Sequence, residues 1–112
     1  MAVTSNRSVT ITQSSDVEYS QEFDAVTNAS GSGTNELTSL SSGNNTITVP
    51  SGAIAVTIIK ALTNTVALTL KGVNGDTGIA LSLTDPDSIS LASVSTFVLN
   101  AASSVSVRLI FS

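Results

Sequence analysis

A two-residue alternation of apolar and polar residues in segment 65–84 is the feature that most constrains how this chain can fold. Two short runs carry the alternation, and a period of two places each apolar trio on one face of an extended strand. The connecting segment 72–78 contains three glycines and an Asn-Gly step, which suit a chain reversal. The six apolar residues of the two runs are Val66, Leu68, Leu70, Ile79, Leu81 and Leu83. Segment 65–84 therefore predicts a β-hairpin that needs a second sheet to cover it.

The same alternation recurs along most of the chain, between turns rich in Gly, Pro, Asn and Ser. The weakly patterned segment 36–40 fits either a helical turn or a strand, and we favour the strand. No segment has a sustained helical period, and strands at this spacing are typical of sandwiches and barrels. The other segments that we expect to be strands are 8–12, 17–25, 46–49, 54–60, 88–91, 96–100 and 104–111. The prediction is an all-β, single-domain antiparallel β-sandwich of about eight strands, jelly-roll-like, with its connectivity open.

The length of 112 residues suits one domain. The polar segment 1–6 is expected to be a flexible N-terminal arm, and 7–112 the sandwich. Strand 17–25 has an acidic outer face, which is either simply solvated or a surface for a cation or a basic partner.

The composition argues against an enzyme. The chain has no cysteine and no histidine, so disulfides, thiolate zinc sites and the common nucleophile–base pairs are excluded. Asp85 and Asp87 flank Pro86 and are expected to form a turn, because short turns leave no cleft for a catalytic carboxylate pair. We therefore expect no catalytic residue, no cofactor and no metal site.

The charge argues against two further classes of partner. The net charge is −4, and only four cationic residues are scattered along the chain, whereas nucleic-acid binding needs several on one surface. No apolar run reaches the length of a membrane span or of a signal peptide. We expect no nucleic acid and no membrane as partners, and synthesis in a cytoplasm.

The turn 72–78 is the candidate structural site. At least one of its glycines is expected to adopt a positive φ, where valine would cost more than about 1 kcal/mol. Asp76 is expected to accept hydrogen bonds from backbone amides, and calcium binding is the weaker alternative because too few acids lie nearby. The candidate turn residues are Gly72, Gly75, Asp76, Thr77 and Gly78.

Two isoleucines occupy strand positions that the two-residue alternation assigns to the outer face. Ile59 and Ile110 fall in the outward register of their strands, and burying such apolar surface is favourable by about 25 cal/mol per Å². Little charge repulsion opposes self-association in a chain with so few charged residues. Ile59 and Ile110 are therefore candidate interface residues, and we expect a homo-oligomer.

The segment LTLKGVNGDTGIALSLTDPDSISL, from Leu68 to Leu91, resembles small virion structural proteins of tailed bacteriophages. In that family an alternating strand leads into a Lys-Gly-x-x-Gly-Asp-Thr-Gly-Ile turn, a second strand, a turn with proline and a short apolar strand. The last strand, Val105–Phe111, also fits, so that the resemblance covers mainly residues 66–111. The residues that carry it are Lys71, Gly72, Gly75, Asp76, Thr77, Gly78 and Ile79.

The resemblance implies a non-enzymatic component of the virion, either a capsid decoration or accessory protein or a tail-surface protein, that binds other virion proteins. It also implies a trimer, since threefold capsid sites favour trimers. The alternative is a ligand-binding β-sandwich, such as an adhesin or a carbohydrate-recognition module, which the Ser-, Thr- and Asn-rich surface favours. Sugar sites commonly use exposed aromatic rings, and the chain has one Tyr, three Phe and no Trp.

Overall fold

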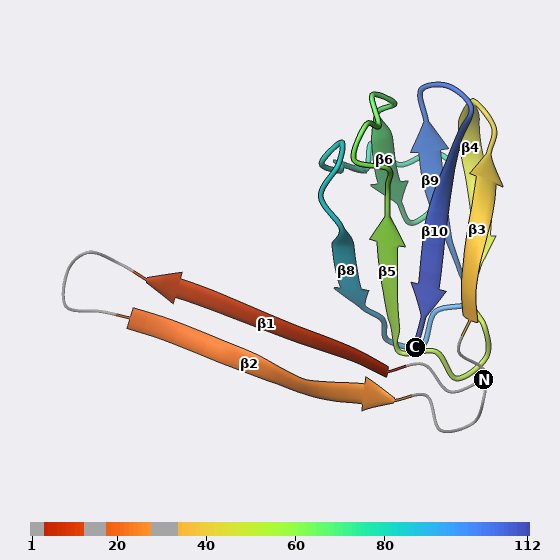
Figure 1. The fold of residues 1–112 in the computed structure, drawn as a ribbon. Helices are drawn as coiled ribbons and strands as arrows, with labels where there is room; N and C mark the ends of the chain where they lie inside the picture. The colour runs from red at the N-terminus through yellow and green to blue at the C-terminus, as the bar shows by residue number, and fades with distance from the viewer. Residues whose placement is uncertain (1–3, 13–17, 28–33) are drawn as a thin grey trace.

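The computed structural model describes residues 4–12, 18–27 and 34–112, and every regular element in these ranges is a β-strand (Figure 1). The described residues form no helix with the length and apolarity that a membrane span requires. The strands are β1 Thr4–Thr12, β2 Glu18–Thr27, β3 Thr34–Leu40, β4 Gly43–Thr48, β5 Ala55–Ile59, β6 Leu68–Lys71, β7 Ile79–Ala80, β8 Asp87–Ser90, β9 Thr96–Ala101 and β10 Val105–Phe111. The predicted all-β class is confirmed.

Eight of the strands form two antiparallel sheets of four. One sheet has the order β3-β10-β5-β8 and the other has the order β4-β9-β6-β7. These pairings are nested along the sequence: β3 pairs with β10, β4 with β9, β5 with β8 and β6 with β7. The predicted β-sandwich of about eight strands is confirmed.

The hydrophobic core lies between the two sheets. Strand β10 shows the alternation that builds it, because Val107, Leu109 and Phe111 are buried while Ser106 and Arg108 are exposed. The opposite sheet contributes residues such as Leu99, and the rings of Phe97 and Phe111 meet with their centroids 6.4 Å apart. Burial of these inward faces supplies the main stabilising free energy of the sandwich.

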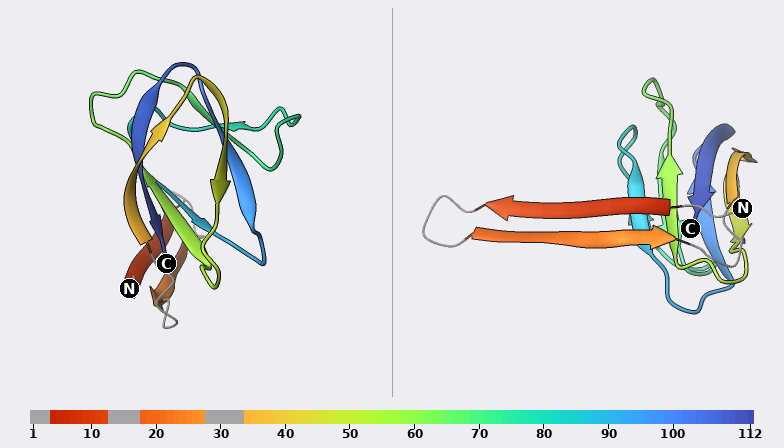
Figure 2. Two further views of the ribbon diagram at one scale, coloured as in Figure 1. Left: turned by 90° about the vertical axis from the view of Figure 1, so that its right-hand side faces the viewer. Right: turned by 60° about the horizontal axis from the view of Figure 1, so that its bottom comes forward.

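The hairpin β1–β2 forms a separate two-stranded sheet. Figures 1 and 2 show it projecting from one end of the sandwich. The sequence predicts a sandwich from residue 7 onward, whereas the two sheets of the sandwich contain residues of 34–112. Residues 4–6 of the predicted arm lie in β1, and residues 1–3 lie outside the described residues.

The central hairpin is confirmed, but its second strand is shorter than predicted. Strand β6 pairs with β7 through Leu70–Ile79 and Thr69–Ala80. The expectation that Ile79, Leu81 and Leu83 share one buried face is wrong, because Ile79 is 67% exposed and Leu83 is also exposed. The physical reason is that β7 lies at the edge of its sheet, and the chain leaves the ladder soon after it.

Candidate functional site

The turn between β6 and β7 contains one glycine in the left-handed region. Gly78 has φ of +79°, while Gly72 and Gly75 have no positive φ, so the expectation holds for Gly78 only. A Cβ on Gly78 would lie 2.6 Å from the carbonyl oxygen of Leu70. Gly78 is therefore required both by its backbone conformation and by the close approach of β6.

Asp76 fixes this turn in the way that the sequence predicts. Its Oδ2 accepts hydrogen bonds from the backbone N–H groups of Gly72 and Val73, both at 3.0 Å. The turn is also tied to β4, because Asn44 Nδ2 donates to the carbonyl oxygen of Asn74 at 3.3 Å. Within residues 4–12, 18–27 and 34–112, no three carboxylate, His or Cys side chains gather into a possible metal site.

A pocket of about 560 Å³ opens between the sheets at the edge formed by β7 and β8. We call it the edge pocket. Its walls are mainly apolar, and the predicted turn contributes Gly72, Asp76, Thr77 and Gly78 to its lining but not Gly75. The other lining residues are Val56, Leu70, Lys71, Ile79, Ile89, Leu91, Val94 and Phe97. Such a pocket suits an apolar group better than a sugar, because its one aromatic ring, Phe97, is only 7% exposed.

The two predicted interface residues lie on one outer sheet face. Ile59 is 37% exposed and pairs with Arg108, and Ile110 lies two residues beyond Arg108 on the same face of β10. On the other side of β10, Arg108 pairs with Leu37, which is 65% exposed. We call Leu37, Ile59, Arg108 and Ile110 the outer patch. The outer patch runs across β3, β10 and β5. Its three apolar side chains lie around the cation Arg108.

Leu37 is the member of the outer patch that the sequence reasoning missed. Leu37 and Leu40 are three residues apart, and on a strand this odd spacing places them on opposite faces. Leu40 is buried, so Leu37 points outward. The odd spacing was the signal that could have identified it once segment 36–40 was interpreted as a strand.

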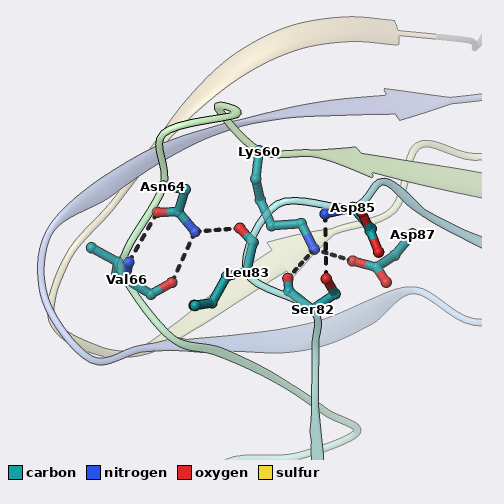
Figure 3. A network of polar contacts seen from close by, with 7 residues as sticks. All are labelled: Lys60, Asn64, Val66, Ser82, Leu83, Asp85 and Asp87. Carbon is teal, nitrogen blue, oxygen red and sulfur yellow. Dashed lines mark hydrogen bonds and ion pairs between the residues drawn. The ribbon is translucent and has the colours of Figure 1, made fainter.

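A second feature that the sequence did not reveal is a buried cation, shown in Figure 3. Lys60 is only 3% exposed, and its Nζ donates to the carbonyl oxygen of Ser82 at 2.6 Å and to the carboxylate of Asp87. Asp87 therefore does more than form a turn with Pro86. The two partners are 27 residues apart in sequence, and the pairing of β5 with β8 brings them together.

Neighbouring side chains extend this network into the adjoining loops. Asn64 accepts from the N–H of Val66 at 3.1 Å and donates to the carbonyl oxygens of Val66 and Leu83, at 3.0 and 2.7 Å. The backbone N–H of Asp85 donates to Ser82 Oγ at 3.3 Å. These contacts pair polar groups of the two loops and hold the loops after β5 and β7 together, so their role is structural.

No family model matches the chain, and neither a curated protein nor a solved structure matches it. The outer patch offers apolar contact with a macromolecular surface, whereas the edge pocket offers a cavity of a size suited to a small apolar molecule.

Proposed function

We propose that this protein is a non-enzymatic structural component of a tailed-bacteriophage virion. In this role it binds other virion proteins on the particle surface, as a capsid decoration or accessory protein or as a tail component, and it is made in the host cytoplasm. The observation that carries the proposal is the outer patch, where Leu37, Ile59 and Ile110 leave apolar surface on one face of a sheet. Exposed apolar side chains that gather on one sheet face are typical of protein-binding faces.

The proposal includes self-association into a homotrimer. Partial exposure of Ile59 and Ile110 on one face supports association, because covering them removes apolar surface from water. The number three depends on the resemblance to phage proteins. The strand orders β3-β10-β5-β8 and β4-β9-β6-β7 support the jelly-roll-like connectivity, in which the first strand of the sandwich lies beside the last.

Mass spectrometry of purified particles tests the proposed location. We expect the chain to be present in many copies, and its absence from the particles would contradict the proposal. Particles that lack the protein then test the outer patch, because the parent chain should bind to them and Ile59→Glu should not. Thr46→Glu is a matched control, since Thr46 is exposed on the opposite sheet.

A second candidate is a ligand-binding β-sandwich, such as an adhesin or a carbohydrate-recognition module. The edge pocket is the observation that favours ligand binding. Its apolar walls predict small apolar ligands, so a glycan array without hits would remove the carbohydrate version and leave the apolar version to be tested. N-phenyl-1-naphthylamine, an uncharged fluorescent probe, should then bind the parent chain and lose affinity in Val94→Arg, which places a charge in the pocket lining.

A further inference from the structure

We infer that the free edge of β4 binds a second copy of this chain, and that the two copies pair through their β4 strands, antiparallel and across a twofold axis. This contact goes beyond the proposed function, because it lies in the sheet opposite the outer patch. Three observations carry it: β4 lies at a sheet edge, it lacks the features that usually protect an edge, and its free backbone groups are symmetric about Thr46.

The other edge strands of the sandwich are protected against pairing. An edge strand presents unpaired N–H and C=O groups, and natural proteins usually block them with short strands, prolines or inward-pointing charges. Strand β7 has two residues, and β8 has four and follows Pro86. On β3, Glu36 points inward, because it pairs with the buried Leu109 and lines a cavity together with it. Each of these three edges therefore opposes the addition of another strand.

Strand β4 is the exception among the four edge strands of the sandwich. It has six residues, Gly43–Thr48, and none of them is a charged residue or a proline. Its register with β9 runs without a bulge, and on its other side it pairs with no strand of the described residues (Figure 1). A regular, uncharged edge of this length is open to pairing with another strand.

The hydrogen bonds of β4 show which backbone groups face its free edge. The N–H of Val49 donates to the carbonyl oxygen of Ser95 at 2.8 Å, in the same register that joins β4 to β9. In an antiparallel ladder the bonding direction alternates from one residue to the next. The odd-numbered residues of β4 therefore bond to β9, whereas the N–H and C=O groups of Asn44, Thr46 and Thr48 point away from it.

These three residues make β4 complementary to a copy of itself. When two β4 strands run antiparallel with Thr46 opposite its own copy, Asn44 of each chain lies opposite Thr48 of the other. All three residues then form hydrogen-bonded pairs, because each has its N–H and C=O on the pairing side. The side chains that meet are threonine and asparagine, which carry no charge to repel each other. The contact is isologous, so two copies complete it.

The β4 contact leaves the outer patch available for other virion proteins. Strand β4 belongs to the sheet β4-β9-β6-β7, whereas the outer patch lies on β3, β10 and β5 of the other sheet. Edge pairing extends a sheet sideways and does not cover the outer face of the other sheet. Together with the proposed threefold contact, it would join trimers in pairs. A charge at Thr46 should abolish edge pairing but not particle binding, and Ile59→Glu should do the reverse.

Light scattering of the full-length Ile59→Glu chain isolates the β4 contact, because this change removes the proposed trimer contact. We expect a mass of twice 11.3 kDa at micromolar concentrations. Adding Thr46→Pro should weaken this association at least about tenfold, because proline lacks the N–H that faces the second copy, and an edge strand tolerates proline at such a position. Thr46→Val is the matched control, since it keeps the N–H and should associate like Ile59→Glu alone.

The absence of cysteine allows a second test that does not depend on the folding of the proline variant. In the Ile59→Glu chain, Thr46→Cys places the only thiol of each chain beside the twofold axis, where bismaleimidoethane can join the two copies. Ser88→Cys is the control, because Ser88 is exposed on β8, whose edge is protected. We expect at least about tenfold more crosslinked dimer with Thr46→Cys, since directly opposed residues are close neighbours. Equal yields would overturn the inference.

Two results of the light scattering would also overturn the inference. One is a mass of 11.3 kDa for Ile59→Glu at every micromolar concentration, which would leave the β4 edge to an extended segment of a different protein. The other is unchanged association in a folded Thr46→Pro variant. Both would leave the virion proposal standing if purified particles contain the protein. Conversely, absence from particles together with a β4-dependent dimer would contradict the virion proposal and support the β4 contact.

Discussion

The hairpin β1–β2 and the sandwich β3–β10 are built by the same rule and differ in what covers them. Both consist of antiparallel strands with alternating residues. In the sandwich each sheet covers the inner face of the other, and residues such as Ile58 and Leu99 are fully buried. The hairpin has the same alternation in its sequence, but within the described residues it pairs with neither sheet of the sandwich. Alternation thus fixes where strands form, whereas burial depends on which layers the chain brings together.

The largest expected effect on stability comes from truncating Ile58 on β5. Its neighbour Ile59 lies on the opposite face, so the two residues compare a covered face with an uncovered one. Ile58 is 0% exposed, and Ile58→Ala should lower the free energy of unfolding by about 4 kcal/mol through lost contacts and a cavity. Ile59→Ala, on the outer face, should cost less than about 1 kcal/mol. Urea unfolding at low protein concentration measures both values. Equal losses would contradict the assignment of Ile59 to an uncovered face.

The strands of the sandwich were largely predictable from sequence, and the separate hairpin was not. Segment 104–111 was predicted from its alternation, and β10 occupies Val105–Phe111 with the expected face buried. Segment 17–25 shows an equally clear alternation, yet β2 belongs to neither sheet of the sandwich. A period of two reports that one face is apolar, but it carries no information about which layer covers that face.

The second expected effect concerns the buried cation that joins β5 to β8. Asp87→Ala should destabilise the sandwich by about 3 kcal/mol, because it leaves the buried Lys60 ammonium without its carboxylate. Asp85→Ala is the matched control, since Asp85 joins the network through its backbone N–H. A loss for Asp85→Ala as large as that for Asp87→Ala, in urea unfolding, would refute the structural role of the ion pair.

The third expected effect concerns the turn beside the edge pocket and is smaller. Gly78→Ala should cost about 2 kcal/mol, because alanine must adopt φ of +79° and its Cβ meets the backbone of Leu70. Gly75→Ala should cost little, since Gly75 has no positive φ and a Cβ there meets nothing within 4 Å. Thermal unfolding distinguishes the two variants. Equal melting temperatures would show that this turn is not constrained as described.

The candidate site was only partly predictable for a related reason. Asp76 and Gly78 act within the turn itself, and local sequence was enough to assign their roles. The ion pair of Lys60 with Asp87 joins residues whose proximity depends on strand pairing, and a single sequence does not specify that pairing. The outer patch was half predicted, because parity identified Ile59 and Ile110 but not Leu37.

Amide hydrogen exchange of the full-length chain at several protein concentrations tests the central contrast most directly. Amides of β5, β9 and β10 should be strongly protected at every concentration, because each of these strands lies between two others and has its inner face covered by the second sheet. Amides of β1 and β2 should exchange faster in dilute solution, because the hairpin is a sheet of only two strands. Strong protection of β1 and β2 at a concentration where the mass is 11.3 kDa would contradict the account.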